Sequence, residues 1–304
     1  MPSKIAVCLA AYNGLRFLPE QLNSILQQTG VLVTLFVSVD VSSDGTEAWF
    51  DKQAKEDDRI VVLPHGQRFG GAALNFFRLV KDIDFTAFDY VAFADQDDIW
   101  LPNKLLRAHE VMEVAGAEAY SSNVTAFWPD GRKMMINKAQ AQTKWDFLFE
   151  AAGPGCTYVL SRKLAQDIQS VVINRWDDMQ TIGLHDWFFY AFARASDYRW
   201  MIDNFSGMLY RQHDKNQVGV NSGLAAVKNR ACTVINGWGL SQASLIANVI
   251  GLGNNSFVRR WSSRKRLALL NLALHAYQCR RRTRDKILFG LSCLLLSIIG
   301  SRGK

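Results

Sequence analysis

The amino-acid sequence predicts an α/β protein with a mixed, mostly parallel β-sheet flanked by helices. Short apolar runs alternate with segments of helical periodicity along the first hundred residues, and that order is typical of parallel sheets covered on both faces. Glycines and small polar residues follow several of the apolar runs, as expected where a strand ends at a loop. Strands are predicted at residues 5–10, 32–39, 60–63 and 90–94, and helices at 15–28, 46–55 and 72–81.

Charge divides the 304-residue chain into two parts. Residues 1–210 carry 19 Lys and Arg against 26 Asp and Glu, whereas residues 211–304 carry 16 against 2. We expect one large domain at 1–222. A basic helical extension is expected at 223–304, facing something anionic.

Cysteine spacing and the first residues bear on the cellular compartment. The five cysteines are scattered and form no CxxC pair, which argues against a zinc site or a disulfide framework and fits a reducing compartment. Met-Pro-Ser-Lys at the start does not resemble a secretory signal. We therefore expect a cytoplasmic protein.

Loops at the carboxyl ends of the predicted strands are the first places to look for a ligand, since ligands of such sheets bind there. Ala10 belongs to a small-residue loop that lets a ligand approach the backbone, and Tyr12 offers a ring for stacking on a base. Asp40 can accept from a base N–H or a ribose hydroxyl, and Arg68 lies in the third such loop. Each of these loops also has a purely structural interpretation: it can be an ordinary turn, cap the next helix, or pack a half-buried side chain such as Tyr12.

An acidic cluster follows the fourth predicted strand. Asp95, Asp97 and Asp98 stand within four residues, and such carboxylates repel one another unless a cation or hydrogen bonds neutralise them. Hard oxygen ligands suit Mg²⁺ or Mn²⁺. The alternative is a solvated acidic turn that caps a helix beginning near Pro102.

The middle of the chain contributes further polar candidates. The turn at 129–131 predicts a hairpin. His185, Asp186 and Trp187 open an aromatic segment, although an acid in the first turn of a helix is also favourable without catalysis. Arg211 and His213 begin a polar stretch that continues to residue 216.

The basic extension ends in a short apolar run. Two arginine-rich clusters, at 259–266 and 280–284, precede about 14 apolar residues at 287–300, fewer than the roughly 20 that a spanning helix needs. This pattern favours an interfacial anchor on the anionic inner leaflet. A packed helix with a solvated basic face is the alternative, and no reader motif supports nucleic acid.

Taken in order, the segments at 10–14, 42–46, 95–100 and 210–213 resemble the successive signatures of the family 2 inverting glycosyltransferases of GT-A fold. The form Asp-Gln-Asp-Asp-Ile-Trp at 95–100 is most similar to bacterial rhamnosyltransferase-type enzymes of O-antigen and capsule assembly. Where relatives often show Asp-Asp-Gly-Ser, this chain has Val39-Asp40-Val41-Ser42.

The resemblance implies a nucleotide-binding half at about 1–116, an acceptor half at about 117–222, and a role for each candidate residue. Tyr12 and Asp40 would hold the nucleoside, with Arg68 near the base or phosphate. Asp95 and Asp97 would bind Mn²⁺ or Mg²⁺, with Asp98 beside them. Asp186 would be the catalytic base and His185 and Trp187 its acceptor-side neighbours, while Arg211 and His213 would close over the donor diphosphate.

The chemistry of inverting transfer agrees with these roles. A leaving diphosphate needs positive charge and an attacking hydroxyl needs a base; Asp186 is favoured for the base, with His185 as the alternative. We expect a metal-assisted transferase that moves a sugar, such as rhamnose, from a dTDP- or UDP-sugar to a lipid-linked glycan at the inner membrane face. The alternatives are a sugar-phosphate nucleotidyltransferase and a non-catalytic, membrane-docked sugar-nucleotide or glycan-binding protein.

Overall fold

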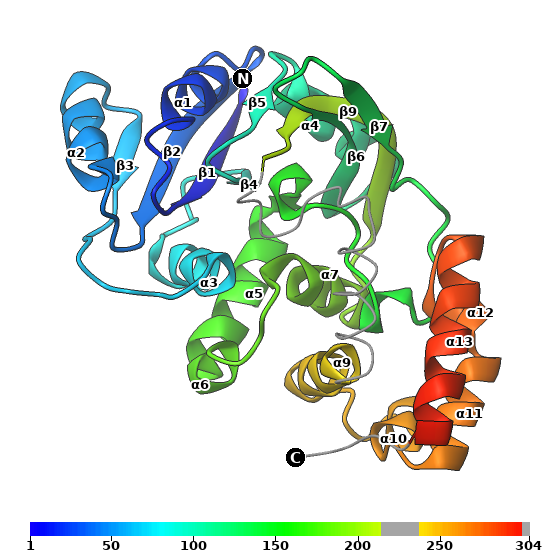
Figure 1. Ribbon diagram of the computed structural model, residues 1–304. Coiled ribbons are helices and arrows are strands. Elements are labelled where there is room, and N and C mark those ends of the chain that lie inside the picture. The colour runs from blue at the N-terminus through cyan, green and yellow to red at the C-terminus, as the bar shows by residue number, and fades with distance from the viewer. Residues whose placement is uncertain (214–236, 300–304) are drawn as a thin grey trace.

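The computed structural model describes residues 1–213 and 237–299 of the chain (Figure 1). The expected boundary at 222/223 and the polar residues 214–216 lie outside these ranges. The strands are β1 Ser3–Ala11, β2 Val31–Val39, β3 Ile60–Val62, β4 Tyr90–Ala94, β5 Ile99–Trp100, β6 Ala119–Phe127, β7 Lys133–Ile136, β8 Val159–Ser161 and β9 Trp200–Arg211. The main helices of the first part are α1 Leu18–Leu26, α2 Thr46–Glu56, α3 Ala72–Asp82, α4 Lys104–Ala115, α5 Arg162–Asn174, α6 Trp176–Met179 and α7 His185–Ala195.

A single mixed sheet organises the described residues, in the order β3-β2-β1-β4-β8-β6-β9-β5, with β7 paired to β6. The first half, β3-β2-β1-β4, is parallel throughout. The second half is largely antiparallel, although β6 and β9 run parallel. The predicted α/β class and the mixed sheet are thus confirmed, and the hairpin expected at residues 129–131 joins β6 to β7.

Alternation along β1 separates two apolar cores. Ile5, Val7 and Leu9 point toward one face, where α1 and α4 pack. Ala6 and Cys8 point toward the other, which α3, α5 and α7 cover. Because successive side chains of a strand alternate between faces, a strand buried on both sides must be apolar throughout, as β1 is.

The first helix begins later than its periodicity suggests. The backbone N–H groups of Phe17 and Leu18 both donate to Gly14 O, at 2.9 and 3.1 Å, so residues 14–17 form a turn and α1 starts at Leu18. Asn13 before this turn has a φ of 47°. The turn keeps the end of β1 open at the edge of the sheet where β2, β3 and β4 also end.

The basic extension packs against the part of the molecule that contains α7. Its helices are α9 Trp238–Val249, α10 Ser256–Ser262, α11 Arg266–Leu274, α12 Ala276–Cys279 and α13 Thr283–Ile299, and α10 to α13 gather at one end of the molecule (Figure 1). Phe257 and Trp261 join the same core as α7. The extension expected as a separate element therefore shares the core of the first part.

Two arginines of the second cluster face inward, which corrects the expectation that both clusters face a membrane. Arg281 is 6% exposed and donates to Asp146 Oδ2 at 3.0 Å and to Ala151 O at 2.7 Å. Arg280 donates to Phe149 O at 2.8 Å. The physical reason is that Asp146, which is fully buried, requires a cation, and residue 281 supplies it.

The apolar run near the end forms α13, and no helix in the described ranges is long and apolar enough to cross a membrane.

We predict that the Asp146 ion pair is needed for stability. Asp146→Ala leaves Arg281 buried without its carboxylate, which should lower the free energy of unfolding by about 3–5 kcal/mol. Asp130→Ala is the matched control, because Asp130 pairs with Arg132 at the surface, where such pairs contribute little to stability. Urea unfolding of both variants measures this, and equal losses would contradict it.

Candidate active site

The loops after β1 and β2 are tied to each other. Asn13 Oδ1 accepts from Ser43 N at 2.7 Å, and Asn13 N donates to Ser42 Oγ at 3.0 Å. Gly14 N donates to Thr46 Oγ1 at 3.1 Å. The polar residues at 42–46 therefore fix the shape of this edge, so that the two loops form one surface.

Asp40 orders the third loop. Its carboxylate accepts from Phe69 N at 3.0 Å and from Gly70 N at 2.9 Å, and the side chain is 5% exposed. Arg68, next to this contact, is exposed, as is Tyr12, at 53%. The side chains expected to contact a nucleoside thus surround one edge, with Asp40 holding the loop that carries Arg68.

Gln96 joins the first loop to the acidic loop. It accepts from Tyr12 N at 2.7 Å and donates to Tyr12 O at 3.0 Å. A Cβ at Gly14 would collide with the Gln96 amide, so a side chain at position 14 would displace this amide from its hydrogen bonds to Tyr12. Ala10, the residue of β1 that pairs with Ser38 of β2, lies just before this junction.

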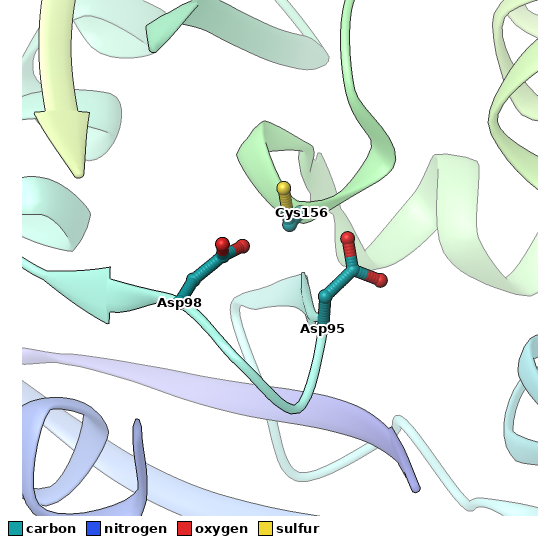
Figure 2. Close-up of side chains that lie close together, drawn as sticks. All are labelled: Asp95, Asp98 and Cys156. Carbon is teal, nitrogen blue, oxygen red and sulfur yellow. The ribbon is translucent and has the colours of Figure 1, made fainter. Parts of the chain in front are cut away.

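Asp95 and Asp98 face each other across Cys156 (Figure 2). One ligand atom from each of the three lies within 4.8 Å of the others. Burial, and then the neighbouring charge of Asp97, raise the pKa of Asp95 to about 7 and raise the pKa of Asp98 as well. Burial also raises the pKa of the Cys156 thiol, which keeps its proton and lowers the pKa of both carboxyls by hydrogen bonding.

Asp97 points toward the end of β9. Its Oδ2 lies 2.7 Å from His213 Nε2, and its backbone O accepts from Arg211 Nε at 2.7 Å. Arg211 N donates to Asp98 Oδ1 at 3.1 Å, while its guanidinium contacts Glu20. Arg211 thus holds the acidic loop through hydrogen bonds from its backbone N–H and its guanidinium. His213 contacts the carboxylate of Asp97.

This donor set fits a hard divalent cation. The carboxylates of Asp95 and Asp98 converge, the carboxylate of Asp97 on the same loop meets the imidazole of His213, and Asp98 Oδ2 is buried without an N–H or O–H donor in the described ranges. Lys104, also buried, lies behind the loop with its Nζ 3.5 Å from the centroid of the Trp100 ring, and burial lowers its pKa to about 7. A cation between the acids would relieve the repulsion that raises their pKa values.

Asp186 lies at the start of α7, close to the acidic loop. Its negative charge contributes to the raised pKa of Asp95, and Asp186 Oδ1 accepts from Trp187 N at 2.7 Å. Burial raises the pKa of Asp186 to about 6. A carboxylate with this pKa is a stronger base than an exposed one and remains deprotonated at neutral pH.

His185 is less suited to the role of base. Its ring stacks on Phe76 with centroids 4.0 Å apart, and burial lowers its pKa to about 3. An imidazole that resists protonation this strongly is a weak proton acceptor. The geometry therefore favours Asp186 over its neighbour.

Trp187 lies behind the site. Its side chain is 6% exposed and its indole N–H donates to Phe147 O at 2.9 Å. Trp187 therefore packs in the core and anchors the start of α7.

Three residues near the site went unnoticed in the sequence. Gln96 stands between two acids, and nothing in the sequence marks it as part of the site. Cys156 follows a Gly-Pro-Gly turn. This turn could have indicated Cys156, because a glycine-rich turn often brings the backbone close to a functional group. Lys138, on the loop after β7, lowers the pKa of Asp186 by its charge, and nothing in the sequence marks it.

Fold and site together define a glycosyltransferase. The chain belongs to glycosyl transferase family 2, whose family model matches residues 6–165. This range contains the three nucleoside-side loops, the acidic loop and Cys156.

Two proteins of similar sequence are glycosyltransferases. The chain is 43% identical over 291 residues to the dTDP-rhamnosyl transferase RfbG of Shigella flexneri, an alignment that covers 95% of this chain and 100% of that protein. It is 26% identical over 180 residues to the UDP-Glc:alpha-D-GlcNAc-diphosphoundecaprenol beta-1,3-glucosyltransferase WfgD of Escherichia coli, covering 57% of this chain and 66% of that protein.

Solved structures share the fold, as expected for a GT-A type sheet. S. aureus TarS in complex with UDP-GlcNAc aligns with a TM-score of 0.57 at 13% identity, over 97% of this chain and 81% of that chain. The mannosyltransferase PcManGT from Pyrobaculum calidifontis, in complex with GDP-Man and Mn²⁺, aligns with a TM-score of 0.54 at 13% identity, over 98% and 88%.

We predict that Gly155 is required for the position of the base. A Cβ there would lie 2.5 Å from His185 Nε2 and 3.2 Å from Asp186 Cβ, so Gly155→Ala must displace the start of α7. A displacement of about 1 Å can lower a rate about 10²-fold. Transfer should fall accordingly with nucleotide affinity retained. Gly239→Ala is the control, since a Cβ there meets nothing within 4 Å; equal rates for both variants would contradict the assignment.

Proposed function

We propose that this glycosyltransferase moves rhamnose from dTDP-rhamnose to a hydroxyl of a lipid-linked polysaccharide precursor, with inversion at the anomeric carbon. The observation that carries the proposal is the placement of Asp186 beside the acidic loop 95–98, which puts a base next to a diphosphate site. The choice of donor is supported by the 43% identity to a dTDP-rhamnosyl transferase over the whole length of that relative.

The donor would lie along the edge formed by the first three loops. Tyr12 is placed for stacking on the base, and Asp40 holds the loop that brings Arg68 toward the nucleotide. The edge accommodates thymine and uracil alike, so UDP-sugars remain the alternative donors. Ala10, with no side chain beyond its Cβ, leaves room beside the nucleoside.

Asp95, Asp97 and His213 would hold Mn²⁺ or Mg²⁺, with Asp98 beneath them. A neighbour of the same fold binds GDP-Man and Mn²⁺, which supports a divalent cation here. When bound, the cation supplies positive charge against the diphosphate as it leaves. Arg211 holds the loop in place and His213 lies where the donor diphosphate would be covered.

Asp186 would accept the proton of the acceptor hydroxyl. As that oxygen attacks the anomeric carbon from the face opposite the diphosphate, the bond to the diphosphate oxygen breaks and its electron pair leaves with the nucleotide. The product carries the sugar in the opposite anomeric configuration. Proton removal by a positioned carboxylate contributes typically about 10²–10⁴-fold.

The acceptor class follows from a relative and from the surface of the molecule. WfgD is named for an α-D-GlcNAc-diphosphoundecaprenol acceptor, and we infer that the present acceptor is also linked to a lipid through a diphosphate. Such an acceptor would be met at the cytoplasmic face of the inner membrane.

An apolar face on α11 and α13 is suited to that membrane. The two helices pack against each other and expose large apolar side chains, with Leu267 80% exposed and Ile298 73% exposed. Exposed cations adjoin this face, namely Arg259, Arg260, Lys265 and Arg266. Apolar side chains beside basic ones favour binding to the interface of an anionic leaflet.

We predict that Leu267→Glu together with Ile298→Glu abolishes binding to phosphatidylglycerol vesicles, because charge replaces the apolar contact. Co-sedimentation with the full-length protein measures this. Val114→Glu is the control, since Val114 is 91% exposed on α4, away from this face. If the double variant sediments like the wild type, the apolar face does not bind lipid.

The pH dependence should identify the base. Asp186 acts only when deprotonated, and its pKa is raised to about 6, so kcat/KM should fall about tenfold per pH unit below that value and level off above it. Asp186→Asn should lower the rate about 10²–10⁴-fold and remove this limb of the profile. A variant that keeps the wild-type profile would exclude Asp186 as the base.

The donor is tested with purified protein, membrane-extracted acceptor and Mn²⁺, offering dTDP-rhamnose, UDP-glucose, UDP-galactose and UDP-N-acetylglucosamine in turn. We expect turnover of dTDP-rhamnose with an inverted product, determined by NMR of the new linkage. Turnover of a UDP-sugar alone would overturn the rhamnose assignment. Retention of configuration would overturn the single displacement.

A further inference from the structure

Lys138 is a half-buried cation whose charge acts on the proposed base, Asp186. It follows β7, and its backbone N donates to Asn123 Oδ1 at 2.6 Å. Its Cβ and Cγ would lie 3.7 Å from a Cβ placed on Gly153. Gly153 is two residues before Gly155, at which an added Cβ would lie 3.2 Å from Asp186 Cβ. Lys138 therefore lies beside the segment that packs against the start of α7.

The arginine cluster of the extension faces the same place. Arg281 N donates to Glu150 Oε1 at 2.6 Å, and Arg280 donates to Phe149 O, so residues 280–282 run alongside the segment that ends at Gly153. The charge of Arg282, followed by those of Arg281 and Arg280, adds to burial in lowering the pKa of Lys138. Lys138 in turn lowers the pKa of Asp186.

The acids nearby are already engaged by other cations. Asp146 pairs with Arg281 and Arg194, and Glu150 lies 3.8 Å from both Arg280 and Arg281. Neither Lys138 nor Arg282 has a side-chain hydrogen bond or ion pair with any residue in the ranges 1–213 and 237–299. The charge of Glu150 also acts on Lys138, but Arg280 and Arg281 share this acid. Positive charge therefore exceeds negative charge around Lys138 and Arg282, and a bound anion would stabilise the two cations.

We propose that Lys138 and Arg282 bind the diphosphate through which the acceptor glycan is joined to its lipid. This inference rests on the proposed function and adds the residues that recognise the acceptor. The donor diphosphate has its own site at the acidic loop, whereas Lys138 and Arg282 lie on the acceptor side of Asp186. Arg282 immediately precedes α13, so a diphosphate held there has its lipid chain next to the apolar face.

Calorimetric titration of the full-length protein with inorganic pyrophosphate tests the site, with dTDP and Mn²⁺ present at saturation so that the donor site is filled. We expect the wild type to bind pyrophosphate, and Lys138→Gln and Arg282→Gln each to weaken that binding about tenfold, as expected for a lost charge-assisted hydrogen bond. Arg284→Gln is the matched control, because Arg284 is exposed and pairs with Asp285. The affinity for dTDP should be unchanged in all three variants.

The other outcomes separate the possible sources of the anion. If pyrophosphate does not bind once dTDP is present, or if Lys138→Gln and Arg282→Gln bind it like the wild type, the acceptor site is overturned. If the two variants lose binding to phosphatidylglycerol vesicles but not to pyrophosphate, the cluster serves a lipid headgroup and the proposal is again overturned. Failure of the wild type to bind dTDP or UDP would instead reject the proposed function.

Discussion

Repulsion among the carboxylates at the end of β4 is the constraint on which the site depends. Asp95, Asp97 and Asp98 are brought together by a tight turn, and burial makes their charges costly. Two hydrogen-bond donors offset part of this cost: the protonated thiol of Cys156 and the backbone N–H of Arg211. These contacts only partly neutralise the cluster, so its remaining charge is available for a cation and a diphosphate.

A second buried carboxylate, that of Asp146, is also neutralised by cations. Buried Asp146 draws Arg281 inward, and this ion pair fixes the extension against the segment that leads to Gly155 and Asp186. One ion pair thereby links the extension to the segment beside the start of α7, whereas the edge of the sheet at the ends of β1 and β2 is built independently by the loops that follow these strands.

Much of the fold was predictable, because β1 and β4 are buried on both faces and must be apolar throughout, and because parallel strands end at one edge. The acidic loop was predictable for the same reason. Pairings distant in sequence were not: Arg281 meets Asp146 across 135 residues, and no local pattern distinguishes an inward arginine from one facing lipid. Likewise, Trp187 shares its motif with Asp186 but points into the core, since the first turn of a helix distributes its side chains over different faces.

Equilibrium binding of Mn²⁺ tests the central claim, that the acidic loop is a cation site, most directly. With the full-length protein saturated with dTDP, loss of the free-ion EPR signal should reveal one Mn²⁺ bound per chain. Asp97→Asn and His213→Ala should weaken that binding about tenfold or more, and Asp130→Ala should not. Absence of Mn²⁺ binding to the wild type, or equal affinity in Asp97→Asn, would contradict the account.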